Sequence, residues 1–138
     1  MRDAGAMKVL AYVLAVAALS PGMYEITTET GMPHLEENLR YSTTHERHCV
    51  TEPEALATAF PVLNHVSLKG CRLGNETRQG DTVSYVLTCE GGHGTTGHAT
   101  WELGDHEMIG TLHVKLGGKN MTFYQRVTAV AVGQCAAK

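Results

Sequence analysis

The stretch CRLGNETRQGDTVSYVLTC, Cys71–Cys89, decides the fold, because it reads as two strands joined by a tight turn. The two strands are expected at residues 68–76 and 82–90, around a three-residue loop with Gly80 near its centre. Cys71 and Cys89 are equidistant from Gly80, so this turn places them opposite each other. Cysteines that face each other across an antiparallel pair can be bridged where their Cα atoms lie ~5.5 Å apart. The spacing therefore predicts a hairpin closed by a Cys71–Cys89 disulfide.

The chain has four cysteines, which allow three pairings. With the hairpin bridge assigned, Cys49 pairs with Cys135 and closes a long loop, which contributes ~4 kcal/mol on the chain-entropy model. Metal ligation and redox chemistry are the alternatives, but the sequence has no C-x-x-C pair and its spacings do not fit a zinc ribbon. The cysteines thus predict two structural disulfides, which is typical of exported proteins.

Alternating apolar and polar residues, separated by Gly, Asn and Asp, continue through the rest of the chain. They predict five further strands, at residues 22–30, 39–50, 97–103, 106–116 and 121–132. Gly104–Asp105 reads as a two-residue turn, and residues 117–120 separate Leu116 from Met121. We predict a mainly all-β fold, an antiparallel meander of about seven strands. Because open sheet edges are a liability, this sheet is expected to close into a barrel or a sandwich.

Pro53–Phe60 is the segment with a helical pattern in this strand-rich chain. Thr51 can serve as its N-cap, and Pro61 ends it. A helix of two turns is not stable alone, so its apolar face, which includes Leu56 and Phe60, must pack on the sheet.

An apolar run near the N-terminus, Val9–Leu19, follows a basic residue and ends in small residues. It is too short to span a bilayer as a helix, which needs ~20 residues, and it is typical of a secretory signal. We expect cleavage after Ala17 or Ala18, which gives a signal peptide at 1–18 and a single disulfide-stapled β domain at 19–138. The alternative is a buried N-terminal strand or helix.

Several function classes lack support in the sequence. The net charge is −3 with no run of basic residues, which argues against nucleic-acid partners. We expect no membrane span in the mature chain, because no second apolar stretch is long enough. The sequence has no G-x-S-x-G nucleophile motif and no phosphate-binding loop. We therefore expect a protein that is not an enzyme and carries no cofactor.

Eight histidines are many for this length, and two of them suggest a metal site. In the register set by the Gly104–Asp105 turn, His98 faces Thr111 and His113 faces Thr96, so the two imidazoles are diagonal neighbours on the exposed face. Glu102 and Glu107 lie opposite each other on that face. Imidazoles with carboxylates nearby suit Zn²⁺ or Cu²⁺. The alternative is a solvated polar face without a ligand.

Three large side chains are candidates for an apolar pocket. The same register sets Trp101 opposite Met108 on the core face, where Phe123 joins them, and places Tyr124 beside His113. In a small barrel such side chains either fill the interior or leave room for one small ligand. Two functions follow as hypotheses: a protein that binds a small apolar ligand or an envelope partner, and a histidine-based metal-binding protein.

The opening Gly22–Thr27 (GMYEIT) resembles the G-x-W/Y-E-x-T start of the domain of unknown function 3617 family, which consists of small exported bacterial proteins. Cys49–Ala55 is similar to the family's C-x-T-P-E-x-A segment. Gly94–Trp101 is similar to its glycine-threonine strand, and Gly133–Cys135 to its closing G-x-C. The resemblance implies a periplasmic or secreted location and a β-rich fold, but it implies no activity.

Overall fold

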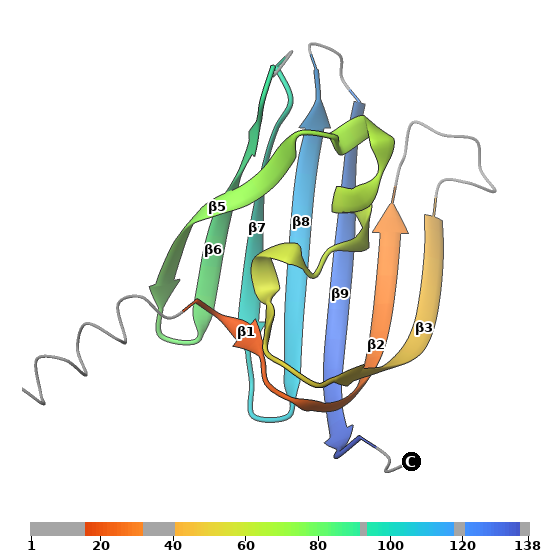
Figure 1. Cartoon of the computed structure of the whole chain (residues 1–138). Helices are drawn as coiled ribbons and strands as arrows, with labels where there is room; N and C mark the ends of the chain where they lie inside the picture. The colour runs from red at the N-terminus through yellow and green to blue at the C-terminus, as the bar shows by residue number, and fades with distance from the viewer. Residues whose placement is uncertain (1–15, 32–40, 92–93, 118–120, 136–138) are drawn as a thin grey trace, which may run out of the picture.

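The computed structural model describes residues 16–31, 41–91, 94–117 and 121–135. Seven strands form one antiparallel sheet in the order β3-β2-β9-β8-β7-β6-β5 (Figure 1). They are β2 Gly22–Gly31, β3 Tyr41–Val50, β5 Cys71–Gln79, β6 Thr82–Cys89, β7 Thr96–Leu103, β8 Glu107–Leu116 and β9 Met121–Gly133. β5 to β9 follow one another as hairpins, and β9 then pairs with β2. The predicted antiparallel meander is confirmed, whereas residues 39–40 of the second predicted strand and 1–15 of the predicted signal lie outside the described residues.

The sheet is open in the part of the chain that the structure describes. β3 and β5 are its two edges, and no ladder joins them. A two-stranded piece of β1 (Ala18–Leu19) and β4 (Glu54–Ala55) lies apart from the large sheet. Neither the closed barrel nor the sandwich expected from the sequence is formed by these residues. The apolar face is buried by a different element.

That element is the connection between the two edge strands, residues 51–70, which we call the crossover segment. Because β3 and β5 lie at opposite edges, the chain between them has to cross one whole face of the sheet (Figure 1). The crossover segment contains β4 and three short 3-10 helices, η1 Leu56–Thr58, η2 Pro61–Asn64 and η3 Val66–Leu68. We call the sheet face beneath it the covered face and the other one the open face.

The α-helix predicted at Pro53–Phe60 is wrong. Ala55 pairs with Ala18 of β1, and the Leu56 N–H donates to the Ala17 carbonyl at 3.0 Å. These backbone groups have partners elsewhere in the fold, so an i to i+4 ladder, marginal at this length, is not needed. None of the helices in the described ranges has the length and apolar character of a membrane span.

The core lies between the crossover segment and the covered face. Leu56 and Phe60 of the crossover segment are fully buried, as is Trp101 on β7. The Phe60 and Trp101 rings pack at a centroid distance of 5.4 Å. The sheet contributes most of the other buried apolar side chains, among them Val83, Tyr85, Leu87, Leu112, Val114, Phe123, Val127 and Ala129. Burial of each large side chain contributes about 1.5–3 kcal/mol.

Two buried polar side chains of the sheet fasten the crossover segment in place. The Trp101 indole N–H donates to the Leu56 carbonyl at 3.2 Å. The amide of Gln125, only 4 % exposed, accepts from the Val62 N–H at 3.0 Å and donates to the Thr30 hydroxyl at 2.8 Å. The covering of the sheet is therefore set by directed bonds as well as by apolar burial.

Both predicted disulfides are present, and Cys71 lies directly opposite Cys89 in the ladder. The turn itself is one residue shorter than predicted, because Gln79 pairs with Thr82 across Gly80 and Asp81. A bulge between Gly74 and Thr77 on β5 shifts the register by one residue and brings the cysteines back into line. The predicted disulfide pairing is confirmed, although the three-residue loop from which it was argued is wrong.

The predicted register of β7 and β8 is wrong by two residues. The connection is longer than Gly104–Asp105, since the Gly104 N–H donates to the Glu107 carbonyl at 2.9 Å and Leu103 pairs with Met108. A Cβ on Gly104 would collide with that carbonyl oxygen, so glycine permits the close approach. As a result, His98 faces His113 directly, and Trp101 faces Gly110 instead of Met108.

Candidate functional site

A cleft of about 220 Å³ opens on the covered face between the crossover segment and the edge strand β3. β3 directs polar residues to this face, with Glu46 opposite Ile26 and His48 opposite Tyr24. These side chains give the crossover segment no apolar surface to pack on, so on β3 the tight core is confined to Val50 at the end of the strand. The cleft is lined by Leu19, Ile26, Thr28, Glu46, His48, Glu54, Thr58, Ala59, Pro61, Asn64, Trp101, Val127 and Ala129.

The floor of the cleft is apolar. It includes Leu19, Trp101, Val127 and Ala129, each at most 2 % exposed, with the partly buried Ile26 beside them. The cleft thus reaches the edge of the packed core. An apolar group placed there would exchange water for contact with aromatic and aliphatic carbon.

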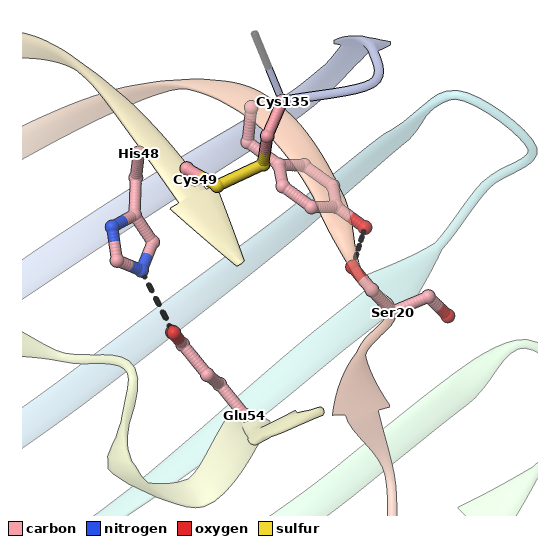
Figure 2. The surroundings of a disulfide bond; sticks show 6 residues. Ser20, His48, Cys49, Glu54 and Cys135 are labelled. Carbon is pink, nitrogen blue, oxygen red and sulfur yellow. Dashed lines mark hydrogen bonds and ion pairs between the residues drawn. A yellow bond between two sulfur atoms is a disulfide. The ribbon is translucent and has the colours of Figure 1, made fainter. Parts of the chain in front are cut away.

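The rim of the cleft is polar. His48 Nε2 lies 2.9 and 3.0 Å from the two carboxylate oxygens of Glu54, which ties β3 to the crossover segment (Figure 2). The His48 side chain is 40 % exposed and that of Glu54 is 42 % exposed, so the pair contributes no more than ~1 kcal/mol to stability. The Cys49–Cys135 disulfide lies next to it and fixes the end of β3 (Figure 2).

A second hollow, of about 400 Å³, lies on the open face over β7, β8 and β9. His98 and His113 stack there with ring centroids 5.3 Å apart, and Tyr124 lies beside His113 at 6.3 Å, as predicted. Glu102 pairs with Ile109, and Glu107 pairs with Val130, so the two carboxylates predicted to face each other do not. No group of three or more His, Cys, Asp or Glu side chains is placed to hold a metal ion within the ranges that the structure covers.

The three residues of the predicted apolar pocket do not line one cavity. Trp101 lines the cleft on the covered face. Phe123 also directs its buried side chain to the covered face, opposite Val114, but it does not line that cleft. Met108 does not line it either and packs against the core between Leu103 and Ala129.

The pairing of His48 with Glu54 was not predicted from the sequence. The two residues are separated by a chain reversal that periodicity does not reveal, and the only signal was the nearby half-cystine at position 49.

A third polar cluster fixes the start of the described chain. The β5 bulge presents Glu76 to the Tyr85 hydroxyl, which donates to it at 2.7 Å, and to the Ala17 N–H at 3.2 Å. Burial, together with the hydrogen bond and negative charge of Glu76, raises the pKa of Tyr85 far above its usual range. This cluster lies apart from both hollows and has a structural explanation: it anchors β1.

The family model described as "Protein of unknown function (DUF3617)" matches residues 19–135. This match confirms the family resemblance seen in the sequence motifs. No curated protein and no solved structure matches the chain.

Proposed function

The chain belongs to the DUF3617 family, and from that premise we propose that it is an exported, non-enzymatic β protein that holds a small, mainly apolar ligand in the cleft on the covered face. The observation that carries the proposal is the cleft itself, whose lining joins the partly buried Ile26 to buried apolar residues around Trp101 at the margin of the core. Ligand sites in proteins are usually concave and apolar with a few fixed polar groups, and this cleft has that composition.

Export is supported by the two disulfides, which use all four cysteines of the chain. Such bonds persist in oxidising compartments and are rare in the cytosol. We therefore propose a periplasmic or secreted location, consistent with the apolar N-terminal run.

The rim suggests the polar end of the ligand. Glu46 and the His48–Glu54 pair lie there, and neither Lys nor Arg is among the lining residues. Carboxylates favour a neutral donor or a cation over an anion. At about 220 Å³ the cleft is below the ~300–1,000 Å³ of pockets for drug-sized ligands, so the ligand is small, such as an apolar amine.

The test uses benzylamine and benzoate, two probes of similar shape and opposite charge, titrated into the ¹⁵N-labelled mature protein. We expect benzylamine to shift the Trp101 indole N–H signal and the amides of Ile26 and Val127, and benzoate to leave them unchanged. Benzylamine shifts scattered over the surface, or equal responses to both probes, would contradict the proposal.

Two pairs of variants locate the probe. Ala59→Phe fills the cleft from the crossover segment and should abolish the shifts, whereas Ser84→Phe adds the same ring on the open face and should not. Glu46→Gln should weaken benzylamine binding several-fold, whereas Glu29→Gln, on the opposite face of β2, should leave it unchanged. Binding that survives Ala59→Phe excludes this cleft.

A further inference from the structure

We propose that His98 and His113 form a binding site for a divalent transition-metal ion, Cu²⁺ most strongly and Zn²⁺ next, on the open face. This site is independent of the cleft on the covered face. The sequence suggested four ligands, but the structure separates Glu102 and Glu107 from the histidines and brings the two imidazoles face to face.

The separation of the two rings fits one shared ion. Imidazole nitrogens bind such ions at ~2.0–2.1 Å, so each ring centre lies about 3 Å from the metal, and two rings at a tetrahedral angle have centres about 5 Å apart. The observed centroid distance between His98 and His113 is 5.3 Å. In the structure the rings are stacked, with an angle of 24° between their planes, so both side chains have to rotate to point a nitrogen at one ion. The direct pairing of His98 with His113 in the ladder brings the rings within reach of a shared ion without a change in the backbone.

The backbone positions of the two histidines are also fixed. β7 and β8 are inner strands, each paired on both sides, so the distance between the two histidines is fixed by the ladder. On the outer sides, Val86 of β6 lies opposite His98, and Tyr124 of β9 lies opposite His113. Because the backbone is already in place, only the two histidine side chains lose conformational freedom when the ion binds.

The surroundings explain which ions the site favours. Two imidazoles select Cu²⁺ and Zn²⁺ over Mg²⁺ and Ca²⁺, which prefer oxygen ligands, and Cu²⁺ leads the affinity order for nitrogen donors. The hollow of about 400 Å³ leaves room for water on the remaining coordination positions. Thr96, Thr122 and Lys115 also line it, so a small anion held by the Lys115 ammonium can share the ion.

The experiment measures Cu²⁺ and Zn²⁺ binding by isothermal titration to the full mature chain, with electron paramagnetic resonance of the Cu²⁺ form. We expect one site whose spectrum shows two equivalent nitrogen couplings. His98→Ala and His113→Ala should each weaken Cu²⁺ binding at least ten-fold and leave at most one coupling. His106→Ala, which removes an exposed histidine from the β7–β8 connection, is the matched control and should change neither readout.

Two glutamate variants and a measurement of Tm test whether the histidine pair alone binds the ion. Glu102→Gln and Glu107→Gln should bind Cu²⁺ as tightly as the unchanged protein, because their carboxylates lie elsewhere. Since the pair exists only in the folded sheet, Cu²⁺ should raise Tm, and this increase should vanish in the His98→Ala/His113→Ala variant. Unchanged Cu²⁺ affinity in that double variant, or an equal loss in His106→Ala, overturns the proposal.

Discussion

The indole ring of Trp101 lies directly over Gly110, its partner on β8, so closely that a methyl group at position 110 would overlap the ring. Trp101 is fully buried and its indole N–H donates to the Leu56 carbonyl, so moving the ring costs packing and a hydrogen bond. On the open face the Tyr124 ring covers Gly31 in the same way, but Tyr124 is only partly buried and can swing into solvent. The same contact therefore has different consequences on the two faces.

Gly110→Ala should destabilise the protein by about 1–3 kcal/mol, because the added methyl group forces Trp101 out of its packed position. Gly31→Ala should cost less than about 1 kcal/mol, since Tyr124 can rotate away and alanine restricts the unfolded chain. Urea unfolding followed by Trp101 fluorescence measures both values. Equal losses in the two variants would show that the covered face is not tightly packed around Trp101.

Gln125→Leu should destabilise the fold by about 1–3 kcal/mol, because it leaves the buried Val62 N–H without an acceptor. The expected local effect is faster hydrogen exchange at Val62 and its neighbours in the crossover segment. Arg126→Ala, at the next position on the opposite face, is the control and should change stability by no more than about 0.5 kcal/mol. A similar loss in both variants would argue against the Gln125 bridge.

The two disulfides should differ in their effect on stability. Cys49 and Cys135 are 86 residues apart and Cys71 and Cys89 only 18, so the chain-entropy model gives about 4–5 kcal/mol for the first bridge and about 3 kcal/mol for the second. Replacing each pair with serine and comparing the urea midpoints tests this order. A larger loss without Cys71–Cys89 would mean that the hairpin bridge acts through native packing beyond loop closure.

Stability should fall at alkaline pH through Tyr85. Its pKa is raised in the folded state, so above its ordinary value of about 10 the unfolded chain releases a proton that the folded chain retains. The contribution is complete below pH 10 and is lost progressively as the pH rises further. Urea midpoints at about pH 8 and about pH 11 should therefore differ more for the unchanged protein than for Tyr85→Phe. Identical pH dependence in the two proteins would exclude this role of Tyr85.

The strands were predictable because each alternates with period two and ends at glycine or a polar turn. The disulfide pairing followed from the symmetry of the Cys71–Cys89 hairpin. The cysteines face each other only because the β5 bulge shifts the register by one residue and so compensates for a turn that is one residue shorter than expected. No sequence pattern predicted the bulge. Strand identity is a local property, whereas register depends on turn geometry to the single residue.

The failures have physical causes of the same kind. Gly104–Asp105 suggested a two-residue turn, but Gly104 is required for contact with the Glu107 carbonyl in a longer connection, and this moved His98 opposite His113. The helix expected from residue 53 was replaced by tertiary partners for Leu56. The cleft was not foreseeable, because it arises where the crossover segment meets a polar edge strand, and the path of that segment is set by the strand order.

Covering a sheet on one side only divides its residues into two sets with separate duties. Substitutions beneath the crossover segment are constrained by the available volume and by the hydrogen bonds of Trp101 and Gln125. The open face of the seven strands is in contact with solvent, and its side chains contribute little to the free energy of folding. Open-face side chains such as His98 and His113 can therefore be exchanged with little effect on the packing beneath the crossover segment.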